Sequence, residues 1–290
     1  EVVIADLTAD ELVEAVLDRS HEIRQRALGE LDRREDKRTI DLATAALSRP
    51  TSNDTDHFDP KVNERADVRV AAARIIAHLS GPKVSSDFIK RGTSVDSPEE
   101  LRRGLAEILA GMNDPGVNRE LLSQLGKGRE REKLFTLHAL AGAKDEKIDK
   151  AVEKMIFDRE QEVVIAACRV LADRKDKDAV PQLQKLLGKT GKEKPLARAA
   201  LDAIVVLRSG DPKWIDELLT MAKSEDQDVR NMALQALGQT TDKKHLPKLI
   251  EALNDKDWST RLAALDAIEN LHAKEGIPAL MMNRTTPKSV

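Results

Sequence analysis

Hydrophobic positions recur along this chain in one phrase that is repeated, with variation, eight times. The clearest copy is residues 229–237, which read VRNMALQAL. Its second residue, called the anchor position here, is followed by a small or apolar residue three positions on and a branched residue four positions later. These spacings place the residues on one face of an α-helix, and the small residue lets a neighbouring helix approach closely. The eight anchor positions are Arg24, Arg69, Arg102, Lys133, Val164, Ala197, Arg230 and Arg261.

A second apolar phrase follows each copy of the first. Residues 245–253 (HLPKLIEAL) and 179–187 (AVPQLQKLL) are its clearest examples. Proline stands in the first turn of the predicted helix, where its missing N–H costs no hydrogen bond. Polar turns rich in Asp, Lys and Gly separate the phrases. The unit is therefore helix–turn–helix, and we predict about 17 helices, eight pairs plus a leading half repeat.

The spacing of the anchor positions indicates a stacked array. Successive anchor positions are 45, 33, 31, 31, 33, 33 and 31 residues apart, and a near-constant period of this size is typical of solenoids. Neither helix of a unit can bury its apolar stripe alone, so the units must stack into one continuous core. We predict an all-α, right-handed α-α superhelix that forms a single domain over residues 1–290.

Three segments interrupt the regular repeats. Residues 1–19 form a half repeat, opened by a capping box from Thr8 to Glu11. The 45-residue spacing contains an insertion at 50–63, rich in Asp, Ser, Thr and Pro, which we interpret as a polar loop. The tail at 284–290 is predicted to be disordered or cut short. Because the array starts on a half repeat and lacks an initiator Met, we expect a piece of a longer protein.

Residues 228–255 resemble a HEAT repeat of the short type called PBS-lyase HEAT-like. The resemblance rests on the opening Asp226, Asp228, Val229 and Arg230, the Ala-x-x-x-Leu stripe and the proline-opened second helix. It covers most of the chain and implies an α-solenoid, a fold that serves many functions. The anchor positions of repeats four to six are Lys133, Val164 and Ala197, so the Asp–Arg ladder that the resemblance implies would be interrupted there.

Composition and charge limit the classes of partner that we expect for the array. Charged residues make up 34% of the chain but the net charge is −3, with both signs interspersed. This balance does not favour nucleic acid or an anionic membrane as the partner, and no apolar run is long enough to span a membrane. The only cysteine, Cys168, lies on an apolar stripe, so we expect a buried structural thiol and not a reactive one.

Two motifs could carry metal chemistry. The His21-Glu22 pair resembles the motif of HEAT-like deoxyhypusine hydroxylases, but a di-iron centre needs several such pairs and this chain has one. An acidic cluster in the insertion could gather around Ca²⁺, although it lacks the glycine and closing glutamate of an EF-hand, which favours a solvated loop. Its members are Asn53, Asp54, Asp56 and Asp59. We expect no catalytic residue, cofactor or metal.

We therefore expect a non-enzymatic scaffold or assembly subunit that binds proteins along its surface. The second helices are expected to line the concave face, where their outward positions alternate in charge and include no aromatic residue. Such a surface does not favour a nucleic-acid groove but can select protein partners by charge matching. The candidate residues are Lys150, Glu153, Gln182, Lys185, Glu217, Lys248 and Glu251. A bilin lyase-like protein and a structural segment of a larger protein remain as alternatives.

Overall fold

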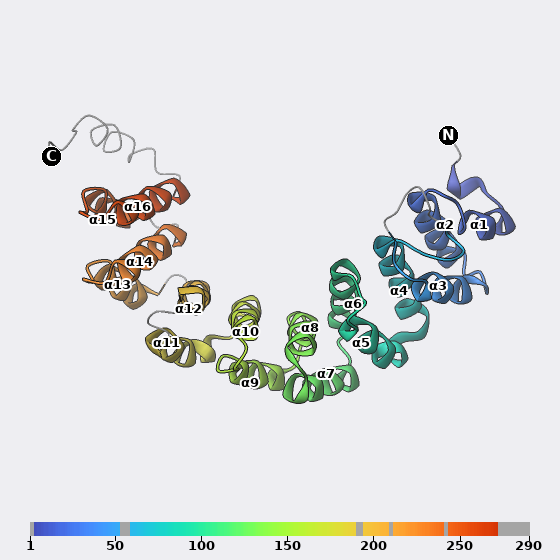
Figure 1. Cartoon of the computed structure of the whole chain (residues 1–290), viewed down its shortest axis with the longest axis horizontal. Coiled ribbons are helices and arrows are strands. Elements are labelled where there is room, and N and C mark those ends of the chain that lie inside the picture. Colours follow the sequence, from blue (N-terminus) through green and yellow to red (C-terminus); the bar gives the residue numbers. More distant parts are fainter. Residues whose placement is uncertain (1–2, 53–58, 190–193, 209–210, 241–242, 272–290) are drawn as a thin grey trace. The chain divides into compact units, whose positions relative to one another are not determined.

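The computed structural model describes residues 3–52, 59–189, 194–208, 211–240 and 243–271. The chain forms two compact units, Glu1–Val152 and Glu153–Val290. Within the described residues the regular structure is helical, and the β pairing is limited to one isolated bridge between Thr51 and Glu64. The all-α prediction is confirmed (Figure 1). None of the described helices has the length and apolar character needed to cross a bilayer.

In unit 1, first and second helices of the repeats alternate along the chain. The first helices are α2 (His21–Arg33), α4 (Ala66–Ser80), α6 (Glu99–Met112) and α8 (Glu130–Leu140). The second helices are α1 (Ala9–Ala15) of the half repeat, α3 (Thr39–Ser48), α5 (Ser85–Thr93), α7 (Pro115–Lys127) and α9 (Glu146–Met155), which runs across the unit boundary. Short 3-10 turns precede α1 (Ile4–Asp6) and α5 (Gly81–Val84).

Unit 2 continues the same alternation. Its first helices are α10 (Gln161–Asp173), α12 (Lys194–Leu207), α14 (Gln227–Gln239) and α16 (Trp258–Asn270). Its second helices are α11 (Val180–Lys189), α13 (Pro212–Met221) and α15 (Leu246–Ala252), with 3-10 turns at Lys177–Ala179 and Lys243–His245. The predicted helix pairs are confirmed wherever the chain is described. The second helix of repeat eight and the tail at 284–290 lie outside the described residues.

The anchor position is the fourth residue of every first helix, from Arg24 in α2 to Arg261 in α16. The apolar stripe that follows it is buried, as the sequence predicts: in α2 the residues Ala27, Leu28 and Leu31 are fully covered. Helix starts also follow the sequence, because Thr8 and Glu11 form the expected capping box at α1. The periodic pattern therefore fixes both the helices and the faces that they bury.

The two rows of helices are packed unequally within each unit. First helices of successive repeats pack directly on one another, as α4 does on α6 and α14 on α16, whereas second helices of successive repeats make few contacts. Small residues permit this approach: a Cβ on Gly104 would lie 2.5 Å from Val70, and one on Gly238 would lie 2.6 Å from Ala267. A stack bends toward its more closely packed row, so first helices line the inner side of each unit. The expectation that second helices line the concave side is therefore wrong.

The insertion at 50–63 is held at both of its ends. The Glu64 amide donates to the carbonyl of Pro50 at 2.8 Å, and the Ser52 amide donates to the carbonyl of Glu64 at 3.1 Å. The Glu64 side chain is fully buried. Residues 53–58, which include most of the acidic cluster, lie outside the described residues. The flanks of the insertion thus belong to the packed structure.

Candidate functional site

An arginine at the anchor position joins three successive parts of the chain. Arg24 in α2 is fully buried, and its Nη1 donates to the carbonyls of Asp18 and Arg19 at 2.8 and 2.9 Å. These carbonyls follow α1 in the turn before α2. The Nε and Nη2 of Arg24 donate to the Glu64 carboxylate, at 3.0 and 2.5 Å to Oε1. Because Glu64 lies just before α4, one side chain fastens the preceding turn and the following repeat.

The same arrangement recurs in unit 2 at Arg230. Its Nη1 donates to the carbonyls of Ser224 and Glu225 at 2.8 and 2.9 Å, in the turn that precedes α14. The guanidinium also pairs forward with Asp257, the N-cap of α16, and lies 3.5 Å from Asp255. A ladder of arginine and acidic residues between repeats is therefore present at both junctions.

The ladder of anchor contacts is not uniform along the chain. Arg69 donates to the carbonyl of Leu47 at 3.0 Å and to the Thr51 hydroxyl. Burial, and then the nearby Arg91, lowers the pKa of Arg69. Val164 and Ala197 are buried anchor residues without a polar group, so they contribute only apolar contacts. The ladder of arginine and acidic residues is thus interrupted at the anchor positions of repeats five and six in the structure, as it is in the sequence.

The predicted candidate residues lie on the second helices and are half-buried or exposed, as expected for a surface row. Several are engaged by neighbours. Lys185 lies 5.8 Å from the centroid of the Phe157 ring, Glu217 pairs with Arg208 at 2.8 Å, and Lys248 pairs with Glu251 at 2.7 Å. The hydrogen bond from Lys248 lowers the pKa of Glu251. Their role in binding stays a prediction, because these contacts describe only the free chain.

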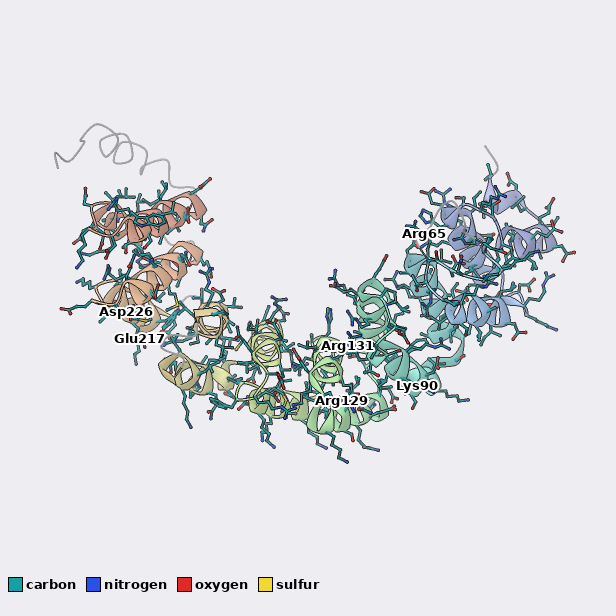
Figure 2. The ribbon with its side chains drawn as sticks, viewed as in Figure 1. Arg65, Lys90, Arg129, Arg131, Glu217 and Asp226 are labelled. Carbon is teal, nitrogen blue, oxygen red and sulfur yellow. The ribbon has the colours of Figure 1, made fainter. Side chains whose placement is uncertain are left out.

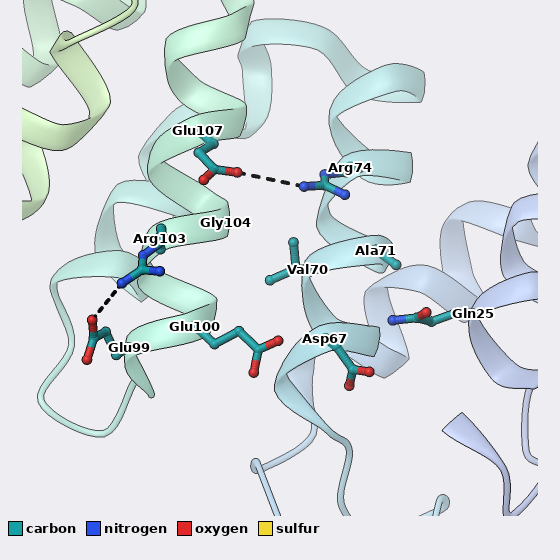
Figure 3. A pocket seen from close by; sticks show the side chains of 10 residues that line it. All are labelled: Gln25, Asp67, Val70, Ala71, Arg74, Glu99, Glu100, Arg103, Gly104 and Glu107. Atoms are coloured by element: carbon teal, nitrogen blue, oxygen red, sulfur yellow. Dashed lines mark hydrogen bonds and ion pairs between the residues drawn. The ribbon is translucent and has the colours of Figure 1, made fainter. Parts of the chain in front are cut away.

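A first groove opens on the first-helix row of unit 1, between α2, α4 and α6. It has a volume of about 580 Å³. Its rim carries the ion pairs Arg103–Glu99, at 2.9 Å, and Arg74–Glu107, at 3.8 Å. Figure 3 shows the Arg74–Glu107 pair reaching across from α4 to α6, the Arg103–Glu99 pair lying along α6, and Glu100 extending toward α4. The lining residues are Gln25, Asp67, Val70, Ala71, Arg74, Glu99, Glu100, Arg103, Gly104 and Glu107.

A second groove opens on the same row in unit 2, between α10 and α12. It has a volume of about 320 Å³. Its lining is more apolar, with a half-exposed Val206 and several alanines, while Arg198 and Asp202 pair across one helical turn at 2.9 Å. The lining residues are Ile165, Arg169, Ala172, Asp173, Pro195, Arg198, Ala199, Asp202, Ala203 and Val206. Sequence reasoning missed both grooves because it assigned the inner side to the other row.

Charged side chains lie along the helices of both units, and Figure 2 labels Arg65 and Arg131 among those of unit 1. In unit 1 the guanidinium of Arg131 donates to the carbonyls of Ser94 and Val95, at 3.3 and 2.9 Å, and so ties α8 to the end of α5. Arg65 pairs with Asp67 at 3.3 Å beside the first groove. The contact of Arg131 thus joins different repeats, whereas the Arg65–Asp67 pair lies within one repeat.

The side chains that could take part in metal or thiol chemistry, His21 and Cys168, lie in structural contacts. His21 Nδ1 lies 2.8 Å from the Asp67 carboxylate, which joins α2 to α4. Burial raises the pKa of the Cys168 thiol to about 12. Among the described residues, no three His, Cys, Asp or Glu side chains converge in a way that could hold a metal ion. These arrangements assign His21 and Cys168 structural contacts.

Comparison with known proteins identifies the repeat. The family model of HEAT repeats matches residues 190–269 and 215–289. No curated protein matches the sequence.

Three solved structures are similar to this chain at low sequence identity. An engineered protein is 18% identical, with 97% of this chain and 85% of that chain covered and a TM-score of 0.41. The complex of CpcE and CpcF of phycocyanin lyase from Nostoc sp. PCC7120 is 19% identical, with coverages of 97% and 95% and a TM-score of 0.31. A second engineered protein is 19% identical, with coverages of 91% and 96% and a TM-score of 0.27.

The family match falls on α12 to α16, where the anchor position, the apolar stripe and the proline-opened second helix repeat in register. The same register runs through the described helices from α2 onward. Residues 190–289 of this chain match the family model of HEAT repeats, and the helices before them follow the same register.

Proposed function

We propose that this chain is a non-enzymatic protein-binding scaffold that holds its partner on the first-helix row. The observation that carries the proposal is the position of the two grooves, each of which is bounded by first helices of successive repeats. A repeat stack offers such a row as a continuous surface within each unit. A partner helix or extended segment running along the row of either unit would meet the groove of that unit.

The chemistry of the grooves suits a protein partner. Their linings include small apolar residues such as Ala71 and Ala199, which leave room for a partner side chain. Their rims carry ion pairs of both signs. Pairs of this exposed kind contribute little affinity each, but they penalise a partner whose charges do not match. Affinity would come from a few apolar anchors, and selectivity from the rim.

The second-helix residues form a second candidate surface. The set Lys150, Glu153, Gln182, Lys185, Glu217, Lys248 and Glu251 mixes signs in the same way, and most of its members are exposed. The first-helix row is favoured because it contains the grooves. The two surfaces lie on opposite rows of the stack and can be altered independently.

The test compares variants of the two rows. A partner would be identified by affinity purification from the native host and then purified for measurement of Kd. We expect Ala71→Arg and Ala199→Arg, which fill the grooves, to weaken binding about tenfold or more. The matched control Ala45→Arg, at an exposed position of α3, should not change Kd.

Two results would contradict the proposal. Charge reversal of Lys150, Lys185 and Lys248 together could abolish binding while the groove variants retain it, which would assign the partner to the second-helix row. Alternatively, the protein could be purified with a bound chromophore and attach it to a substrate, which would support the lyase-like alternative.

A further inference from the structure

Each first helix packs one face against the next repeat, and we call this the leading face. Its residues can be identified by their position relative to the anchor position. The residue directly after the anchor position lies on the leading face. Asn231, which follows Arg230, donates through Nδ2 to the Ser259 hydroxyl of α16 at 3.0 Å. Val70, which follows Arg69, lies against Gly104 of α6. Gln227, three residues before the anchor, also donates to Ser259, so it lies on the same face.

On α16 the corresponding positions are apolar and exposed. Trp258 stands three residues before the anchor position and is 68% exposed, and Leu262 follows the anchor and is 45% exposed. The two are four residues apart and therefore neighbours on one helix face. A tryptophan beside a leucine, both open to solvent, is the type of apolar pair that anchors a partner.

The anchor residue of α16, Arg261, makes the same backward contacts as the arginines that join other repeats. Arg261 Nη1 donates to the carbonyls of Asp255 and Lys256 at 2.8 and 3.1 Å, as Arg24 and Arg230 do in their own turns. Arg24 and Arg230 also pair forward with the acidic residues Glu64 and Asp257. Within the part of the chain that the structure describes, Arg261 has no such forward carboxylate, and its side chain is exposed.

We propose that the leading face of α16 binds an α-helix of a partner protein. That helix carries an acidic residue at or just before its N-terminus, to pair with Arg261, and a small residue on the turn that faces Leu262. Both requirements come from the junctions already present, where Glu64 and Asp257 supply the carboxylate and Gly104 and Ser259 supply the small side chain. This surface is separate from the two grooves, so the inference goes beyond the proposed function.

The test uses a probe helix taken from this chain. A hydrocarbon-stapled, fluorescein-labelled peptide of residues 96–112 contains Asp96 before the helix and Gly104 within it. Binding to the full chain is followed by fluorescence anisotropy. We expect saturable binding that weakens about tenfold or more in Arg261→Glu and in Trp258→Ala. The control Arg159→Glu, which changes an equally charged residue of the same unit that is 83% exposed, should bind like the parent.

A charge exchange sharpens the experiment. If Arg261 pairs with the acidic end of the probe, a peptide with Asp96→Lys and Glu99→Lys should bind Arg261→Glu better than it binds the parent. Absence of saturable binding to the parent, or equal affinity for the parent, Arg261→Glu and Trp258→Ala, would overturn the proposal.

Two other occupants would also overturn it, and each has its own signature. In a Trp214→Phe background, Trp258 is the only tryptophan, and an open face gives fully water-exposed emission. Blue-shifted emission at every protein concentration would mean that the chain's own residues cover the face. Blue-shifted emission that grows with concentration, with a doubled mass by light scattering that Trp258→Ala restores to one chain, would assign the face to a second copy.

Discussion

Replacing Glu64 with alanine should destabilise the first repeats of unit 1 severely. The Glu64 carboxylate is fully buried and accepts hydrogen bonds from Arg24, which is itself fully buried. It also accepts from the Arg65 amide at 2.9 Å and lies 3.7 Å from Nη1 of Arg49. Without the carboxylate, Arg24 would keep its two carbonyl partners but hold an uncompensated charge away from water.

The size of the effect follows from that unpaired charge. Removing one partner of a buried ion pair costs about 3–5 kcal/mol, because the remaining ion loses its compensation without regaining water. This is a large share of a typical folding stability of roughly 5–15 kcal/mol. Replacing both partners, with Arg24→Met and Glu64→Leu, removes both charges. We expect the double variant to be more stable than Glu64→Ala, although Arg24 also bonds to two carbonyls.

Hydrogen exchange measured by mass spectrometry locates the damage. Contacts in a repeat stack are between neighbours, so exchange should accelerate first in α1 to α4 and remain unchanged in unit 2. Thermal unfolding gives the accompanying loss of stability. The control is Glu22→Ala, an exposed carboxylate on α2. A loss below about 1 kcal/mol, or a double variant no better than Glu64→Ala, would refute the reasoning from buried charge.

Four further predictions concern three single residues and the insertion. Cys168 should resist iodoacetamide at pH 8 in the folded chain and react on unfolding, because burial raises its pKa to about 12. Hydrogen bonds from Arg33 and Arg34 lower the pKa of Glu30 from 4.5 to about 2. The ionised Glu30 carboxylate therefore stabilises the folded chain fully above about pH 4.5, and this contribution is lost as the pH falls toward 2. Glu30→Gln should remove this part of the acid sensitivity, seen as a change in the slope of stability against pH. Ala233→Asp should cost about 3 kcal/mol or more in urea unfolding, since it buries a carboxylate at a fully covered position. Replacing residues 53–58 with Gly and Ser should leave the melting temperature within a few degrees, whereas replacing all of 50–63 should lower it further because the Thr51 contact with Arg69 is lost.

The sequence predicts the helices well because their pattern is local. The first helices begin three residues before the anchor positions, since a 3.6-residue period leaves few alternatives once the small and branched residues are placed. The burial of Cys168 follows from the same stripe. Periodicity also places the candidate residues of the second helices on an outward face, as with Lys185 and Lys248.

The inner side of the stack could not be predicted in the same way. It depends on how closely neighbouring helices approach, which is decided by pairs of residues from different repeats, such as Val70 with Gly104 and Gly238 with Ala267. A single phrase contains only one member of each pair. Both grooves depend on that spacing, so their residues were missed. The burial of Glu64 was missed for a related reason, because it lies beside an insertion that has no counterpart in other repeats.

The change of anchor residue from arginine to Val164 and Ala197 has a mechanical consequence. Arg230, bonded backward and forward, resists rotation of one repeat against the next, because its hydrogen bonds depend on direction. The apolar anchors at α10 and α12 impose no such restraint, since apolar contact is not directional. Elastic compliance within unit 2 should therefore concentrate at the α10–α12 and α12–α14 junctions. The second groove lies in the first of these junctions, and an occupant there would change the local curvature of the stack.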